Sequence, residues 1–257
     1  MDSLETRDQA AVVREAGGQT FLSGSKAQTE AKAGSHADQQ SDLLSDLQKS
    51  GCPVCNHLIK TAFEFLCERQ YKLSDDDPTQ RAFADQLGFC PLHTWQLAAV
   101  ASPLGLSLAY PKLLERLSTI LSSFSVEPSE AAGPVAALVR SPESCQVCRL
   151  LECEERAYTA RFCQSLAGPA GRDAYRRSCG LCLRHLASLV VASPAAEVTG
   201  FLLGEAARRF DQTAQDLRNY ALKRRAGRRV LVTCDEDEAP LRALVCLAGH
   251  KALCVPR

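Results

Sequence analysis

Eight cysteine and histidine side chains recur in two matched sets, and their types suit a metal ion. The first copy reads Cys52-Pro-Val-Cys55 and then, after 34 intervening residues, Cys90-Pro-Leu-His93. The second copy reads Cys145-Gln-Val-Cys148 and then, after 33 intervening residues, Cys182-Leu-Arg-His185. Four half-sites in the same order, at nearly the same intervals, are hard to obtain by chance and indicate an internal duplication.

Three cysteines and one histidine are a common ligand set of tetrahedral Zn²⁺. The two-residue gap lets both side chains of a pair reach one ion from a single turn, and the longer interval leaves room for two helices that return the chain to the metal. We therefore expect one closed, structural Zn²⁺ site within each copy, with no position open for a substrate. The expected ligand sets are Cys52, Cys55, Cys90 and His93 for one site, and Cys145, Cys148, Cys182 and His185 for the other.

Two other chemistries compete with zinc. The same side chains could hold an iron–sulfur cluster or act as redox thiols, which makes an iron–sulfur or thiol redox protein the main alternative. A dithiol redox site of the Cys-Pro-x-Cys type normally follows a strand in a βαβ unit, but no such pattern surrounds Cys52, and Gln146 replaces the proline in the second copy. The zinc deaminase pattern fails because no His-x-Glu accompanies the cysteines. No catalytic acid, base or nucleophile stands out, so we do not expect an enzyme.

The elements that must position these ligands read as helices throughout. Apolar residues recur with a 3.6-residue period after Cys55 and after Cys148. Gly88 and Gly180 precede the second pairs, where a left-handed glycine would end one helix and turn the chain, so the ligand pairs are expected at helix N-termini. Ser-Pro steps at residues 102–103 and 193–194 predict helix starts. The expected later helices cover roughly 103–124, with Pro111 able to split it, and 194–226; shorter ones are expected at 78–87, 172–178 and 238–252.

The predicted organisation is an all-α protein of two related modules. Residues 1–45 are poor in large apolar side chains and predict a disordered tail. Module 1 is expected over 46–127 and module 2, with its linker, over 128–230. The linker itself is placed at 126–142, where three prolines fall. A C-terminal helix is expected within 231–257.

The motifs "CPVC" with "LGFCPLHTWQLA" and "CQVC" with "GLCLRHL" resemble an uncharacterised bacterial family of small helical proteins. That family carries tandem Cys-Pro-x-Cys and Gly-[Phe/Leu]-Cys-x-x-His modules, and the likeness covers roughly residues 50–250. The resemblance implies the same two ligand sets, one in each copy, but it names no activity. Gln146 departs from the family pattern.

Composition limits the function without naming it. Lys and Arg number 30, as do Asp and Glu, so net charge points to neither nucleic acid nor membrane. The first residues lack the features of a secretory signal, and no apolar run is long enough to span a bilayer, so we expect a cytoplasmic protein. Its partner is expected to be a protein or small molecule. A basic run at 223–229 keeps a nucleic-acid-binding regulator open as a further alternative.

Other cysteines and histidines have weaker claims to a function. Cys67, Cys153 and Cys163 are expected in the core, Cys179 could compete with Cys182 as a ligand, and His57 is expected at the surface or behind a ligand. The C-terminal cluster could form a third metal site, although a core-facing stripe is the simpler interpretation. Its members are Cys234, Cys246, His250 and Cys254.

Overall fold

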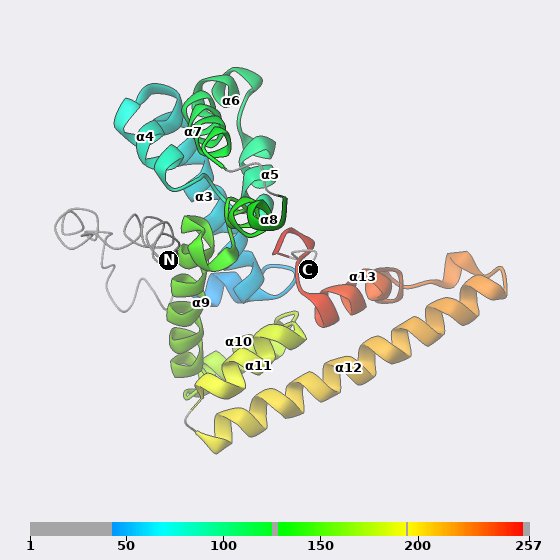
Figure 1. Ribbon diagram of the computed structural model, residues 1–257. Helices are drawn as coiled ribbons and strands as arrows, with labels where there is room; N and C mark the ends of the chain where they lie inside the picture. Colours follow the sequence, from blue (N-terminus) through cyan, green and yellow to red (C-terminus); the bar gives the residue numbers. More distant parts are fainter. Residues whose placement is uncertain (1–42, 125–127, 194, 254–257) are drawn as a thin grey trace, which may run out of the picture. The chain divides into compact units, whose positions relative to one another are not determined.

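The computed structural model describes residues 43–124, 128–193 and 195–253, all within one compact unit, residues 42–257. In these ranges the chain forms α-helices and short 3-10 turns, with no strand, which confirms the all-α prediction (Figure 1). Most of the predicted tail, 1–45, lies outside the described residues; residues 43–47 form a helical turn whose Leu43 and Leu47 are buried.

The first copy is built on one long helix followed by shorter ones. Its helices are α3 (Pro53–Asp75), α4 (Asp77–Asp85), α5 (Pro91–Val100), α6 (Pro103–Ala109) and α7 (Pro111–Ser122). Pro111 splits the helix expected over 103–124, because a proline lacks the N–H that a continuous helix requires. Ser102 caps α6 through a hydrogen bond that its hydroxyl accepts from Gly105 N at 3.0 Å, as the Ser-Pro step predicted.

The second copy repeats this plan with different lengths. Its elements are α8 (Pro128–Ala137), η1 (Pro142–Ser144), α9 (Gln146–Ser165), α10 (Pro169–Arg177), α11 (Leu183–Ala192) and α12 (Ala196–Arg225), followed by η2 (Arg229–Leu231), α13 (Cys234–Ala248) and η3 (Lys251–Leu253). Most of the expected linker is therefore helical, in α8. The helix expected over roughly 194–226 is confirmed as α12, but Ser193 does not cap it: the N-cap is Ala195, with no side-chain cap.

The C-terminal helix α13 begins four residues before the expected residue 238. Its start is held by a capping box, in which the Thr233 side chain accepts from Glu236 N and the Glu236 side chain accepts from Thr233 N. Lys223 of α12 also donates to the Glu236 carboxylate at 2.7 Å. The segment Arg229–Thr233, with its brief strand-like alternation, begins with the 3-10 turn η2.

The two long helices α3 and α9 pack side by side in opposite directions. Arg69 near the end of α3 donates to the Gln146 side chain at the start of α9 (3.1 Å). His57 near the start of α3 pairs with Glu154 further along α9 (3.2 Å). The start of each long helix therefore lies beside the later part of the other.

Two buried cores form around this antiparallel pair, and each draws residues from both sides of residue 128. One core combines the start of α3 with parts of α9, α10, α11 and α12, including Leu58, Phe162 and Leu202. The other combines the rest of the first copy with Cys145 and Val147 at the start of α9. Leu151 packs against both cores. The division into modules at residue 128 stays a prediction, but the packing unites the two copies across it.

No helix among the described residues is long and apolar enough to cross a membrane.

Candidate metal centres

All four ligand pairs occupy the same position in their helices. Cys52, Cys90, Cys145 and Cys182 are the N-caps of α3, α5, α9 and α11, each with an extended backbone. The second ligand of each pair therefore falls three residues later, in the first turn, so that the two side chains point to the same side. Unpaired N–H groups and the helix dipole at this end favour a thiolate. The predicted placement of the ligand pairs at helix N-termini is confirmed.

The structure brings all eight side chains together in two groups of four, but not in the sets expected from the sequence. Centre A, as we name the first group, joins Cys52 and Cys55 of copy one with Cys182 and His185 of copy two. Centre B joins Cys90 and His93 of copy one with Cys145 and Cys148 of copy two. Within each group the ligand atoms all lie within 4.8 Å of one another. The expectation of one complete ligand set within each copy was wrong.

The length of α3 and the direction of α9 explain this exchange. The 23 residues of α3 carry the chain about 34 Å away from Cys52. The nine residues of α4 bring it back by only about 13 Å, so Cys90 cannot return to Cys52. It meets instead the start of α9, which lies beside the far part of α3. By the same antiparallel packing, Cys182 comes to lie at the start of α3.

Left-handed glycines turn the chain into both second pairs, as predicted. Gly88 has φ of 73° and Gly180 has φ of 80°. A Cβ on Gly88 would lie 2.9 Å from Leu113 Cδ2, and one on Gly180 would lie 2.9 Å from the Arg209 side chain. Both positions therefore favour glycine because of their positive φ, and a larger residue would also displace the Leu113 or Arg209 side chain.

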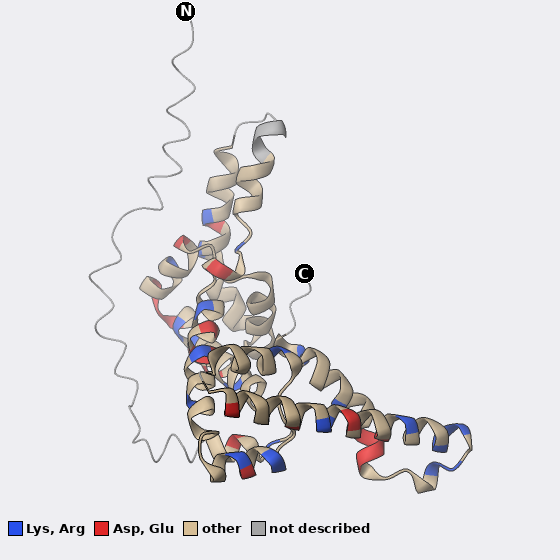
Figure 2. Cartoon of the chain, turned by 90° about the horizontal axis from the view of Figure 1, so that it is seen from below, with Lys and Arg blue, Asp and Glu red and all other residues tan. Residues whose placement is uncertain are grey.

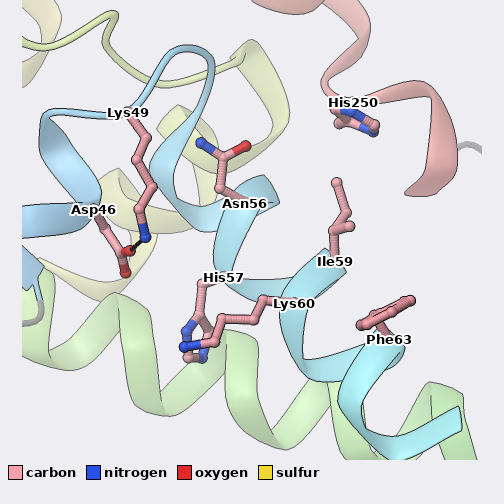
Figure 3. Close-up of a pocket in the computed structure, with 8 residues that line it drawn as sticks. All are labelled: Asp46, Lys49, Asn56, His57, Ile59, Lys60, Phe63 and His250. Carbon is pink, nitrogen blue, oxygen red and sulfur yellow. Dashed lines mark hydrogen bonds and ion pairs between the residues drawn. The ribbon is translucent and has the colours of Figure 1, made fainter. Parts of the chain in front are cut away.

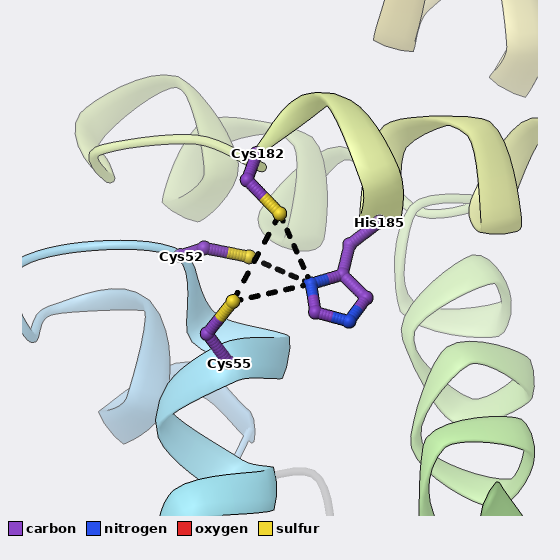
Figure 4. Close-up of side chains that lie close together, drawn as sticks. All are labelled: Cys52, Cys55, Cys182 and His185. Atoms are coloured by element: carbon purple, nitrogen blue, oxygen red, sulfur yellow. Dashed lines mark hydrogen bonds between the residues drawn. The ribbon is translucent and has the colours of Figure 1, made fainter. Parts of the chain in front are cut away.

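Centre A is enclosed on all sides. Its four ligands are each exposed by 2 % or less. His185 Nδ1 faces the sulfurs, at 3.4 Å from Cys52 Sγ, 3.3 Å from Cys55 Sγ and 3.2 Å from Cys182 Sγ, and the Cys55 and Cys182 sulfurs are 3.9 Å apart (Figure 4).

A carboxylate stands behind the histidine of centre A. Glu155 Oε1 on α9 lies 3.4 Å from His185 Nε2, at ion-pair distance, although the pair lacks good hydrogen-bond geometry. Arg184 holds the other oxygen of Glu155 at 2.8 Å. A carboxylate in this place fixes the ring so that Nδ1 points toward the ligand cluster, an arrangement that recurs behind metal-binding histidines.

Gly249, at the end of α13, covers the sulfurs of centre A. A Cβ added there would lie 3.2 Å from Cys55 Sγ and 3.4 Å from Cys182 Sγ. The glycine has φ of 76°, which lets α13 end at this point. Gln96 donates to Ala252 O at 2.8 Å and ties the following residues to α5. The C-terminal segment thus closes centre A against solvent.

Centre B is less enclosed. Cys90, His93 and Cys145 are buried, but Cys148 is only half-buried. His93 Nδ1 lies 3.2 Å from Cys90 Sγ, 3.6 Å from Cys145 Sγ and 3.3 Å from Cys148 Sγ. The Cys90 and Cys148 sulfurs are 3.7 Å apart. His93 Nε2 is buried with no hydrogen-bond partner, and among the described residues no carboxylate lies at ion-pair distance from it, whereas Glu155 does so for His185.

The pKa values of the cysteines show how poorly each cluster holds several negative charges by itself. Hydrogen bonding to Cys148 lowers the pKa of the Cys145 thiol to about 3, and the contact with His93 adds to this, against the effect of burial. The same bond to Cys145, together with burial, raises the pKa of Cys148. In centre A, hydrogen bonds to Cys52 and Cys55 lower the pKa of Cys182, while hydrogen bonds to Cys182 and Cys55, together with burial, raise the pKa of Cys52.

The pKa of His185 in centre A is also set by the neighbouring side chains. Burial lowers the pKa of His185, but hydrogen bonding to Cys182 and Cys55 and the contact with Glu155 outweigh it and raise the pKa to about 11. In each centre, then, the pKa of one thiol is lowered, that of Cys182 in centre A and that of Cys145 in centre B, while the pKa of Cys52 and the pKa of Cys148 are raised. A divalent cation would displace the thiol protons and neutralise the sulfur charge, which is how thiolate sites bind metal.

The remaining candidates from the sequence lie outside both centres. His57 stacks on Tyr158, with ring centroids 4.4 Å apart, and pairs with Glu154. Cys179 is exposed and does not join centre A. Cys163 is buried as expected, but Cys67 is half-buried and Cys153 is exposed. Among the described residues no third metal group forms, and Cys254 lies outside them.

A surface pocket of about 400 Å³ lies near the start of α3 (Figure 3). Its lining includes Asn56, His57, Phe63 and His250, and the Asp46–Lys49 ion pair (2.7 Å) stands at one side. None of the eight ligands lines it, so the pocket gives no access to either centre.

Comparison with known proteins adds one match. The model of a family of unknown function, DUF6062, covers residues 42–225. The chain belongs to the DUF6062 family. This match includes all eight ligands of both centres and ends at the last residue of α12, so α13 and Gly249 lie beyond it. No curated protein matches the chain, and no solved structure does.

Proposed function

We propose that this protein is a helical scaffold held together by two structural Zn²⁺ ions, each shared between the two copies of the duplication. The observation that carries the proposal is the exchange of half-sites, which leaves every group of four drawn from both copies. An ion in either centre would tie the first turn of a helix from copy one to the first turn of a helix from copy two. The bound metals would then lock the copies into one body.

The spacing of the ligand atoms supports a single zinc ion in each centre. A tetrahedral site with Zn–S of about 2.3 Å and Zn–N of about 2.0–2.1 Å places sulfurs about 3.8 Å apart and each sulfur about 3.5 Å from the nitrogen. The Cys55 and Cys182 sulfurs are 3.9 Å apart, the Cys90 and Cys148 sulfurs are 3.7 Å apart, and the sulfur–nitrogen distances run from 3.2 Å to 3.6 Å. An iron–sulfur cluster places several atoms between its ligands and would require wider spacing.

The closed ligand sets favour a structural role over a catalytic one. Three cysteines and one histidine fill a tetrahedral site and leave no position for water or substrate. Such a site contributes on the order of 10 kcal/mol to folding when its metal binds. The metals would hold the helices in place so that the outer surface can bind a protein or small-molecule partner.

The test is metal analysis of the full chain purified without oxygen. Two zinc ions per chain, no visible absorbance, and loss of helical signal when a strong chelator removes the metal would agree with the proposal. Brown protein with iron and acid-labile sulfide would contradict it and favour the redox alternative. Full helicity and an unchanged unfolding temperature after complete chelation would exclude a structural role.

A further inference from the structure

The helices α12 and α13 form an antiparallel hairpin whose turn, residues 222–231, is strongly basic. Arg224, Arg225, Arg228 and Arg229 are exposed, and none of them makes an ion pair with another described residue. Lys223, by contrast, is paired with Glu236. We name residues 222–231 the hairpin tip. Its positive charge is not neutralised within the fold.

The hairpin tip also exposes apolar side chains among these arginines. Val230 is 94 % exposed, Leu222 is 65 % exposed and Leu231 is 55 % exposed. Gly227, with φ of 69°, reverses the chain between the basic residues. Figure 2 shows basic residues gathered at the end of the hairpin, with acidic residues of α13 set back from it. The exposed acidic residues of the first turns of α13 are Asp235, Asp237 and Glu238.

We propose that the hairpin tip docks on the surface of an anionic lipid bilayer. Arginines would meet the lipid phosphates, and Val230 and Leu231 would enter the boundary between headgroups and acyl chains. This pairing of basic and apolar side chains is typical of segments that bind membrane surfaces. This docking would involve contact with the bilayer surface only and requires no membrane-spanning helix.

The same features fit a nucleic acid less well. Non-specific binding to single strands uses exposed aromatic rings on which bases stack. The ring nearest the hairpin tip, Tyr220, already lies under the Arg224 guanidinium, with 5.6 Å between the guanidinium carbon and the ring centroid. The exposed apolar residues would gain nothing from a phosphate backbone.

The experiment is co-sedimentation of the full, metal-loaded chain with vesicles. One set is pure phosphatidylcholine and the other contains equal parts of phosphatidylcholine and phosphatidylglycerol. The variants are R228S/R229S and V230S/L231S in the hairpin tip. The matched control is R116S/R177S, which removes the same charge from exposed arginines of α7 and α10. All these side chains are exposed, so folding is checked simply by circular dichroism and metal content.

We expect the wild-type chain to sediment with the anionic vesicles and not with the neutral ones, and to be released by salt. R228S/R229S should weaken this binding at least tenfold, V230S/L231S should weaken it severalfold, and the control should leave it unchanged. Binding to neither vesicle, equal binding to both, or equal loss in the control and tip variants would overturn the proposal. So would tip-dependent binding to a random-sequence DNA duplex or RNA strand with no vesicle binding.

Discussion

Centres A and B have the same kinds of ligands at the same helical positions, yet their surroundings differ. In centre A, Glu155 stands behind the histidine and Gly249 covers the sulfurs. In centre B, no carboxylate among the described residues lies at ion-pair distance from His93, and Cys148 is half-buried. The duplication thus preserved the ligands, whereas the helices around them diverged. Metal retention should follow the surroundings, so centre A should hold its ion more firmly.

The largest expected effect tests which half-sites share an ion. C52S combined with H185A removes two ligands of centre A, so the chain should lose about one zinc of two. C52S combined with H93A damages both centres, so it should lose both ions, and with each ion on the order of 10 kcal/mol of folding free energy. Zinc content of the purified variants measures this. If C52S/H93A lost one zinc and C52S/H185A lost both, the ligand sets would lie within each copy, and the exchange of half-sites would be wrong.

The next largest effect concerns Glu155, which supports the histidine of centre A and has no counterpart among the described residues at centre B. E155Q should weaken metal binding at centre A by about 10- to 100-fold, because the carboxylate that orients His185 and raises its basicity is lost. Competition with a zinc-binding dye, monitored in a C90S background that lacks a complete centre B, measures the change. E154Q is the matched control, since Glu154 pairs with His57 and touches neither centre. Equal zinc affinity of E155Q and E154Q would show that Glu155 does not support metal binding at centre A.

The third prediction concerns Gly249, whose backbone lies against the sulfurs of centre A. A valine there would press on Cys55 Sγ and Cys182 Sγ, and overpacking of this kind costs about 1–3 kcal/mol, so we expect roughly tenfold faster release of metal from centre A to a chelator. G227V is the control, because Gly227 also has positive φ, yet a Cβ there meets nothing within 4 Å. If both variants release metal at the same rate, backbone strain alone explains the effect.

The smallest effect compares the two Ser-Pro steps. S102A should cost about 0.5–2 kcal/mol of stability, because Ser102 caps α6. S193A should cost much less, since α12 starts after Ala195 and Ser193 caps nothing there. Chemical denaturation of the metal-loaded variants measures both. A larger loss for S193A would contradict the difference between the copies.

The local features of both centres could be read from the sequence. A Cys-x-x-Cys or Cys-x-x-His pair at a helix start uses only four neighbouring residues, and Gly88 and Gly180 act through their own backbone conformation. For the same reason the helix starting at Pro103 and the break at Pro111 were predicted correctly. The start of α13 lies four residues before the expected residue 238, because the capping box of Thr233 and Glu236 begins the helix within an acidic stretch that has no apolar period.

The sequence by itself determined the four pairs of candidate ligands, their positions at helix N-termini and the helical class, because these depend on contacts within a few residues. Only the tertiary structure decided which pairs meet, which histidine gains a carboxylate and which centre is covered by α13. Those outcomes depend on the antiparallel packing of α3 against α9, which arises from burial of apolar surface by segments about a hundred residues apart. With 33 or 34 residues between them, the two pairs of one copy could meet each other or could each meet a pair of the other copy. The length of α3 favours the second arrangement.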